Sequence, residues 1–273
     1  HLTDRAQTFT FSGITSRPVV SLNRGFSAPV TLHFAQSAED LGHIARHDSD
    51  LFARWQAITD LALPVLTDAA KTARDGGSVT ASAAFVDVLL AVAADEALEP
   101  AFRAQALTLP SEADIARELG GNNDPDAIHA GRQAVLTAIA TSGADMFAKL
   151  HATHSASGPF SPDAAGAGKR SLKNIALSFL TLAQNTPSLA ADAFAKSDNM
   201  TDMSQALTIL AHRFPDATET KEALAAFETR FASNALVLDK WFSIQATIPG
   251  SAGLDRVKAL MQSPHFAPTN PNR

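Results

Sequence analysis

The spacing of hydrophobic residues changes once along the chain, close to Ser37. Before that point apolar and polar residues alternate, as in the run around Phe9 and Phe11, and short apolar runs follow at 18–22 and 28–34. Alternation with a period of two is typical of β-strands, so this stretch predicts two or three strands. We expect these strands to need partners from the helical part, a second copy or further polypeptide, because so few strands are not stable alone.

From Ser37 onward apolar residues recur three and four positions apart, which is the period of an amphipathic helix. Residues typical of helix starts accompany this pattern at Ser37 with Asp40, Ser49 or Asp50, Ser111 with Asp114, and Asp124 with Pro125. Beyond the first two helices, which end by the glycines at 76–77, the expected helices span 81–94, 98–108, 111–119, 124–154, 169–185, 187–196, 201–213, 217–231, 233–246 and 252–262.

Two features qualify this pattern. Pro64 is expected to kink the second helix, and Gly131 or Gly143 to interrupt the long one. The stretch 155–168 is rich in Gly, Pro and Ser and predicts a loop. Successive antiparallel helices with short links favour a mainly α fold, a superhelical solenoid of helix pairs of the ARM or HEAT type with a few N-terminal β-strands, although no repeat of fixed length is visible.

The stretch 234–246 carries the largest apolar side chains of the C-terminal half. The residues expected to form one buried stripe on a helix are Leu236, Val237, Trp241, Phe242 and Ile244. A packing helix needs no chemistry of its own, so this stripe by itself predicts a core and no site.

Composition limits the class of protein and its partners. The 273 residues are 45% hydrophobic and 18% charged, which is typical of globular domains, and the net charge is −6 without a basic run. Nucleic acid and anionic membrane are therefore not expected as partners, and no apolar run is long enough to span a bilayer. The absence of cysteine excludes disulfides and thiolate zinc sites and fits a cytoplasmic location.

Several blocks of sequence carry a resemblance to a known family. They are F-S-A-P-V-T-L-H-F (26–34), R-H-D-S-D-L-F-A-R-W (46–55), D-P-D-A-I-H (124–129), K-R-S-L-K-N-I-A-L-S-F-L (169–180), N-M-T-D (199–202), L-V-L-D-K-W-F-S-I-Q-A (236–246) and H-F-A-P-T-N-P-N-R (265–273). In this order they resemble the C-terminal part of the bacterial aminopeptidase N family, the alanyl aminopeptidases among the gluzincin zinc peptidases.

The resemblance implies a domain division and a role. Residues 1–36 would be the last strands of a β-sandwich, and 37–273 a helical C-terminal domain truncated at its C-terminal end, since a helix start at Asn270 is cut short. It also implies a parent enzyme that removes N-terminal residues from peptides. There the helical domain packs on the catalytic domain of the same polypeptide and controls access to its zinc site. Asn272 and Arg273 are the candidate chamber-lining residues.

The chemistry of that family is not encoded in this chain. A gluzincin uses H-E-x-x-H, in which two histidines bind zinc and the Glu activates water. The nearest match, His43 to His47, has Ile44 in place of the Glu, and the chain has no tyrosine and no G-A-M-E-N. His151 and His154 share a helix face without a third ligand. We therefore expect no catalytic or metal-binding residue here, no cofactor in this chain, no activity of the chain alone, and zinc only in the parent.

The sequence allows two further interpretations. G-A-G-K-R-S (166–171) resembles a phosphate-binding loop, but Asp163 stands where its first glycine is required and Arg170 where Ser or Thr would hold magnesium. The alternative function is a free-standing helical-repeat scaffold that binds another protein on its concave face. That alternative accounts for the absent catalytic residues, whereas it leaves the N-terminal strands and the cut helix unexplained.

Overall fold

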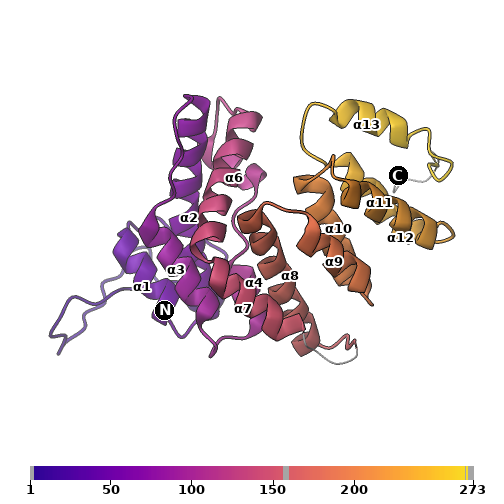
Figure 1. Cartoon of the computed structure of the whole chain (residues 1–273). Coiled ribbons are helices and arrows are strands. Elements are labelled where there is room, and N and C mark those ends of the chain that lie inside the picture. Colours follow the sequence, from indigo (N-terminus) through magenta and orange to yellow (C-terminus); the bar gives the residue numbers. More distant parts are fainter. Residues whose placement is uncertain (1–2, 156–159, 268, 270–273) are drawn as a thin grey trace.

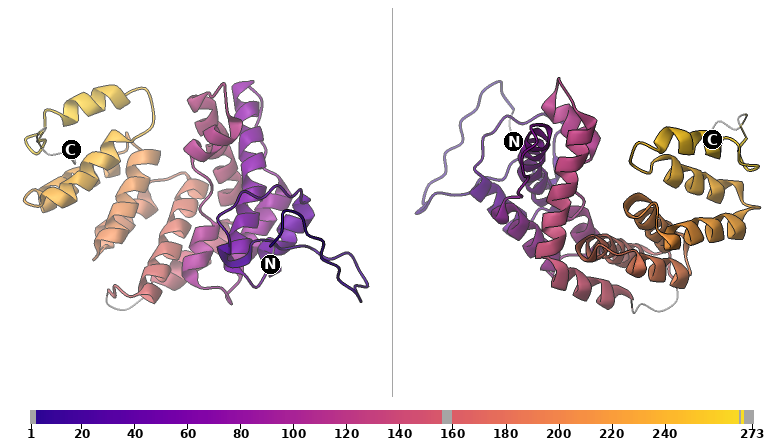
Figure 2. Two further views of the ribbon diagram at one scale, coloured as in Figure 1. Left: turned by 180° about the vertical axis from the view of Figure 1, so that it is seen from behind. Right: turned by 45° about the horizontal axis from the view of Figure 1, so that its top comes forward.

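A computed structural model describes residues 3–155, 160–267 and 269. In these residues the chain forms thirteen α-helices and one short 3-10 helix. The helices follow an open arc, with α1 to α6 toward one end, α8 in the middle and α11 to α13 toward the other (Figure 1, Figure 2). The predicted helical solenoid is confirmed.

The helices of the N-terminal part are α1 (Ala38–His47), α2 (Leu51–Arg74), α3 (Ala83–Ala94), α4 (Pro100–Ala106), α5 (Glu112–Leu119), α6 (Pro125–Ser142) and α7 (Ala144–Ser155). They are followed by α8 (Ala164–Gln184), α9 (Ser188–Lys196), α10 (Met200–Arg213), α11 (Thr218–Phe231), α12 (Ala235–Ala246) and α13 (Gly253–Leu260).

Four of the helices in the described residues start at capping side chains that the sequence predicts. Ser37 accepts the backbone N–H of Asp40, and Asp50 accepts that of Ala53. Ser111 and Asp114 form a reciprocal capping box at the start of α5. Each of these side chains satisfies a backbone N–H that has no partner inside its helix.

The first core is the buried cluster that runs from Ile44 to Leu180, built from α1 to α8. Its two longest helices, α2 and α6, approach each other closely at Gly131. A Cβ atom on Gly131 would lie 2.6 Å from the backbone of Ala69 and Ala70. Only glycine fits there, because real Cβ contacts are essentially never so short. Gly131 thus lies within α6, and the predicted interruption falls at Gly143, the C-cap of α6.

Two buried arginines tie helix ends into the first core. The Nε of Arg54 donates to the carbonyl of Ala45 at 2.8 Å, and the Nε of Arg103 donates to that of Ala93 at 2.7 Å. Both carbonyls lie in the last turn of a helix, where the helix itself supplies no partner. The two guanidinium groups therefore satisfy acceptors that burial would otherwise leave unpaired.

The second core is the buried cluster from Leu177 to Leu260, built mainly from α9 to α13. Phe227 is fully buried, and Trp241 contacts Phe242 edge-on with ring centroids 5.2 Å apart. The indole N–H of Trp241 donates to the carbonyl of Leu224 at 3.0 Å. The predicted stripe is confirmed for Trp241, Phe242 and Ile244.

The prediction was wrong for one member of that stripe. Leu236 is 75% exposed, whereas Leu238, outside the predicted stripe, is 1% exposed. Leu236 lies in the first turn of α12, after the capping Asn234, where the helix turns it away from the second core. Val237 is partly buried against the second core, so the apolar face of α12 begins one residue later than the sequence pattern suggests.

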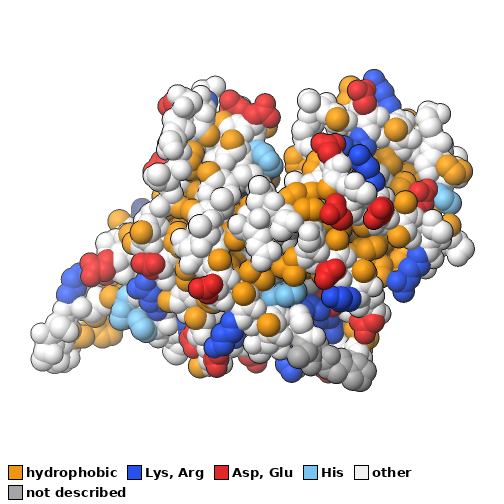
Figure 3. Space-filling model, viewed as in Figure 1, with side chains coloured by type: hydrophobic (Ala, Val, Ile, Leu, Met, Phe, Trp, Pro, Cys, Tyr) orange, Lys and Arg blue, Asp and Glu red, His pale blue; other side chains and the backbone are white. Residues whose placement is uncertain are grey.

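Helix α8 belongs to both cores. Leu172, Phe179 and Leu180 are part of the first core, whereas Leu177 is part of the second. Among the described residues, every substantial contact between α1–α7 and α9–α13 is made through α8, which packs on α4, α6 and α7 and also on α9 and α10. The space-filling view shows the molecule hollowed between the two ends of the arc (Figure 3).

The expected N-terminal strands are not formed in residues 3–36. This segment includes the 3-10 helix η1 (Arg24–Phe26) and contacts α1 and α2 at a few points. The guanidinium of Arg17 pairs with the carboxylate of Asp40, and the tilted rings of Phe26 and Phe52 have centroids 5.2 Å apart. A strand needs a neighbouring strand to pair its backbone groups. The segment finds none among the described residues, and its apolar side chains, such as Phe11 at 77%, remain exposed.

The region after α7 also differs from expectation. Part of the predicted 155–168 loop lies outside the described residues, and α8 begins at Ala164, five residues earlier than predicted. Asp163 caps it by accepting the N–H of Gly166 at 2.6 Å. Across the described ranges, none of the helices combines the length and apolar character needed to cross a membrane.

Candidate functional site

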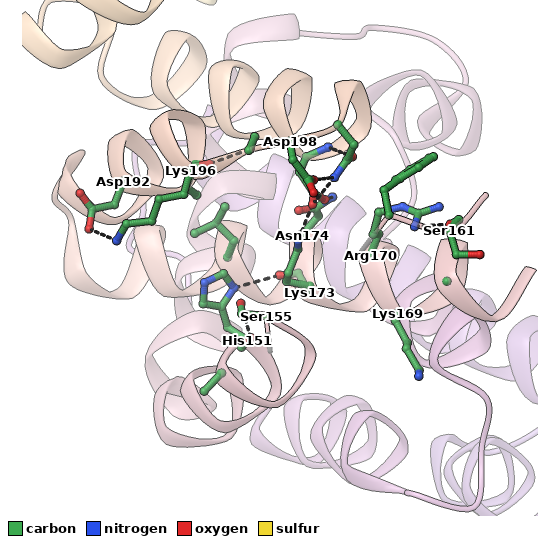
Figure 4. Close-up of a pocket in the computed structure, with 18 of the residues that line it drawn as sticks. His151, Ser155, Ser161, Lys169, Arg170, Lys173, Asn174, Asp192, Lys196 and Asp198 are labelled. Atoms are coloured by element: carbon green, nitrogen blue, oxygen red, sulfur yellow. Dashed lines mark hydrogen bonds and ion pairs between the residues drawn. The ribbon is translucent and has the colours of Figure 1, made fainter. Parts of the chain in front are cut away.

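A cleft of about 700 Å³ lies where α7, α8, α9 and the start of α10 meet (Figure 4). Its lining is unusually rich in charged side chains of both signs. They are Asp163, Lys169, Arg170, Lys173, Asp192, Lys196, Asp198 and Asp202. Because the cleft adjoins α8, it lies at the junction of the first and second cores.

Arg170 is held rigidly at one side of the cleft. Its Nη1 donates to the carbonyl of Ser161 at 2.7 Å, and its guanidinium lies 4.6 Å from the ring centroid of Phe160. Its Nε is buried and has no hydrogen-bond partner among the described residues. The neighbouring Asp163 has a lowered pKa, mainly because it accepts the backbone N–H of Gly166 and also the hydroxyl of Ser161.

A network of polar side chains joins α8 to α10 at the floor of the cleft. The carboxylate of Asp202 pairs with the ammonium of Lys173. It also accepts the amide of Asn174 at 2.9 Å and that of Asn199 at 2.9 Å. Burial pushes the pKa of Asp202 up, but these donors together lower it below its usual value. The network stays ionised and connects the two cores by charge-assisted bonds.

The opposite wall comes from α9 and the link that follows it. Lys196 pairs with Asp192 at 3.1 Å on the surface of α9. Asp198 accepts the amide of Asn199 at 2.9 Å through one carboxylate oxygen. Figure 4 shows Asp192 and Lys196 at the far side of the cleft from Arg170.

His151 contributes a neutral imidazole. Its pKa is lowered by burial first and by the nearby Lys173 charge, against a raising hydrogen bond to the Lys173 carbonyl at 3.3 Å. A carbonyl oxygen only accepts, so Nδ1 carries the proton and Nε2 is left as an acceptor. At neutral pH the residue thus offers a lone pair and no charge.

The histidine pairs do not assemble a metal centre. His43 and His47 lie together on the exposed face of α1 with ring centroids 4.9 Å apart, and Ile44 is buried beneath them. Within the described ranges no group of three His, Asp or Glu side chains could hold a metal ion. Zinc requires three protein ligands in a catalytic site, so these residues do not fit the zinc centre of a gluzincin.

Two sequence hypotheses have different outcomes. Asn272 and Arg273, the candidate chamber-lining residues, lie outside the described residues. The phosphate-loop resemblance at 166–171 falls inside α8, where Asp163 already occupies the helix N-terminus. A phosphate-binding loop needs free backbone N–H groups at that position, so this stretch is not one.

Comparison with known families identifies the helical part. Residues 38–273 match a family model described as a domain of unknown function (DUF3458_C) with ARM repeats. The chain belongs to this family. Residues 1–35 match a second model described as a domain of unknown function (DUF3458) with an Ig-like fold.

Relatives of this ARM-repeat chain include bacterial proteins named aminopeptidase N. This chain is 39% identical over 276 residues to an aminopeptidase N of Caulobacter vibrioides and 32% identical over 276 residues to one of Escherichia coli. Both matches cover 100% of the chain and 31% of the relative, so the chain spans about a third of their length. These matches confirm the resemblance to the C-terminal helical region of aminopeptidase N.

A solved structure shows the same fold. The Legionella pneumophila aminopeptidase A, determined in complex with aspartic acid, superposes with a TM-score of 0.82 at 29% identity. The match covers 97% of this chain and 31% of that one. The fold is therefore shared with a piece of a much longer aminopeptidase.

The cleft is not apparent from the sequence pattern. Two of the blocks that carry the resemblance, 169–180 and 199–202, meet there through Asn174 and Asp202. A usable signal was present, because an Asn and an Asp on otherwise apolar helix faces indicate a buried polar network. Which residues would partner them was not readable without the packing of α8 on α10.

Proposed function

We propose that this chain is the C-terminal region of a zinc-dependent aminopeptidase that removes N-terminal amino acids from peptides. The observation that carries the proposal is similarity over the whole chain to bacterial proteins named aminopeptidase N. In this proposal residues 1–36 end a β-domain and residues 37–273 form the helical domain. The zinc ligands and general base belong to another part of the same polypeptide, since the histidines described here do not form such a site.

The helical domain acts by controlling access. An arc of helices placed over the catalytic domain excludes folded proteins, admits short peptides and removes water from the reacting groups. Asn272 and Arg273 line the chamber in this proposal and contact the substrate beyond the scissile bond. The absence of cysteine supports a cytoplasmic enzyme.

The test compares the 273-residue chain with the product of the uninterrupted gene. Zinc content and hydrolysis of an alanine amide reporter are measured for both. The longer product is expected to hold zinc and cleave, and the chain alone to do neither. Stoichiometric zinc and turnover in the chain alone would assign ligand roles to His43 and His47 or to His151 and His154, and would refute the proposal.

The access role needs a separate measurement on the longer product. Arg273→Ala is expected to raise KM for a tetrapeptide more than for the short amide reporter, because only the longer substrate reaches that side chain. Arg74→Ala, an exposed residue at the end of α2, is the matched control. Equal effects on both substrates would remove Arg273 from the chamber.

A further inference from the structure

The charges of the cleft are separated between its walls. On the α8 wall, Lys169 and Arg170 outnumber the single carboxylate of Asp163. On the α9 wall, Asp192 and Asp198 outnumber the single ammonium of Lys196. Between them Lys173 and Asp202 cancel. The cleft therefore has little net charge but is positive on one side and negative on the other.

This separation of charge between the two walls disfavours the binding of a simple anion or cation. An anion near Arg170 would be opposed by the carboxylates of the far wall, and a cation near Asp198 by Lys169 and Arg170. A ligand with both charges, held apart by a short linker, satisfies both walls at once. The space between the walls is lined by Leu177, Leu189 and Ala193, which suit an aliphatic body.

The guanidinium of Arg170 is fixed in a position suited to binding a carboxylate. Phe160 and the Ser161 carbonyl fix its guanidinium, so that little side-chain entropy is lost on binding. Arg170 forms no ion pair with a carboxylate among the described residues. Its Nε is buried, which leaves the remaining N–H groups on its Nη atoms for a ligand. A planar guanidinium with free N–H groups matches a carboxylate bidentately.

We propose that this cleft binds short peptides with free termini, the carboxylate at Arg170 and Lys169 and the ammonium at Asp198 and Asp192. His151 Nε2 lies in the same lining as an acceptor for a peptide N–H. The site would take the peptide class that the proposed enzyme acts on. Its existence does not depend on the proposed function, because the chain alone contains every residue involved.

The test measures binding of alanine, dialanine and trialanine to the 273-residue chain. Calorimetry gives the affinity, and amide shifts in NMR give the helices involved. Each peptide is compared with its N-acetylated form and its C-terminal amide. We expect saturable binding of at least one free peptide and a loss of at least about tenfold in affinity when either terminus is blocked, since each block removes one charge contact. Shifts are expected in α8 and α9.

Two variants test which side chain binds the carboxylate of the peptide and which binds its ammonium group. Arg170→Gln should remove the discrimination between the free peptide and its amide, and Asp198→Asn the discrimination between the free and acetylated peptides. Arg74→Gln and Asp68→Asn, exposed on α2, are the matched controls and should change neither. No saturable binding by any free peptide, equal affinity for blocked and free forms, or shifts confined to other helices would each overturn the assignment.

The result is independent of catalysis. Failure of the reporter assay in the longer product would refute the aminopeptidase proposal and leave peptide binding by the cleft intact. Conversely, an active longer enzyme whose isolated C-terminal chain shows no binding would refute the cleft proposal alone.

Discussion

The two cores are built differently although they share a helix. The first core has long helices, with α2 of 24 residues and α6 of 18, whose backbones approach each other at Gly131. In the second core α9 to α13 have at most 14 residues each and surround α10 with aromatic side chains. The first core therefore includes a close backbone contact in addition to its packed side chains, whereas the second is held by the fit of large side chains.

This difference explains how a solenoid can carry a polar cleft. Where α2 and α6 meet there is no room for polar groups, because a close backbone approach excludes them. At the α8 and α10 junction the helices are joined instead by Asp202 and its donors, beside a cleft. The junction is therefore the place where the two cores can respond to a ligand or to a change of charge.

The largest expected effect comes from removing one large side chain from each core. Phe147 and Phe227 are both fully buried, and each contacts a second ring, Phe179 at 4.5 Å and Phe231 at 4.8 Å. Phe147→Ala and Phe227→Ala should each lower the free energy of unfolding by about 3–5 kcal/mol, because each leaves a cavity. Denaturant titration measures the loss.

Hydrogen exchange separates the two cores in these variants. Phe227→Ala is expected to accelerate exchange in α10 to α12 more than in α2 and α6, and Phe147→Ala the reverse. Uniform acceleration throughout the chain by either variant would instead show that the two cores unfold as one unit.

A smaller effect is expected at the polar junction. Asp202→Ala leaves the Lys173 ammonium, whose side chain is only 16% exposed, without its carboxylate. A loss of about 2–3 kcal/mol is expected, less than for a fully buried pair because water reaches part of the site. Exposed Asp192→Ala on α9 is the control, with a loss below about 0.5 kcal/mol.

The pH dependence of the free energy of unfolding shows whether ionised Asp202 stabilises the fold. Because the folded-state pKa of Asp202 is lowered, its stabilisation is present above the unfolded value of about 3.9 and is lost as the pH falls further through the folded pKa. Asp202→Asn should flatten the stability profile below about pH 4. An unchanged acid slope in the variant would show that Asp202 is not ionised in the network.

The smallest expected effect lies at one helix end within the first core. Ser111→Ala removes the capping box of α5 and should cost about 1 kcal/mol. The hydrogen bonds from Ser111 and then Arg117 lower the pKa of Asp114 to about 2, so the variant should move it upward toward its usual value. Carboxyl NMR titration measures the shift, and a midpoint that stays near 2 in the variant would contradict the role of Ser111.

Local chemistry made much of the fold predictable. Ser37, Asp50, Ser111 and Asp124 each cap the helix that the sequence assigned to them, because capping depends only on residues within one turn. The mainly helical class followed from the period of the apolar residues. By contrast, the break at Gly143 and the contact at Gly131 depend on what packs against each glycine, which the sequence does not state.

The candidate site was less predictable for a related reason. Its walls come from α7, α8, α9 and the α9 to α10 link, and the ion pair between Lys173 and Asp202 joins residues 29 positions apart. Pairing at that distance is decided by how the helices stack. The exposure of Leu236 shows the same limit on a smaller scale, because the pattern locates a helix face only to within about one residue.

The N-terminal segment, residues 3–36, affects the tendency of the chain to associate with itself. Phe9, Phe11, Val30, Leu32 and Phe34 are each about half or more exposed, on backbone that pairs with no neighbouring strand in the described structure. Such a segment offers both apolar surface and free hydrogen-bonding groups to another molecule. Self-association of this chain at high concentration should therefore begin at its N-terminal segment, with the net charge of −6 as the opposing force.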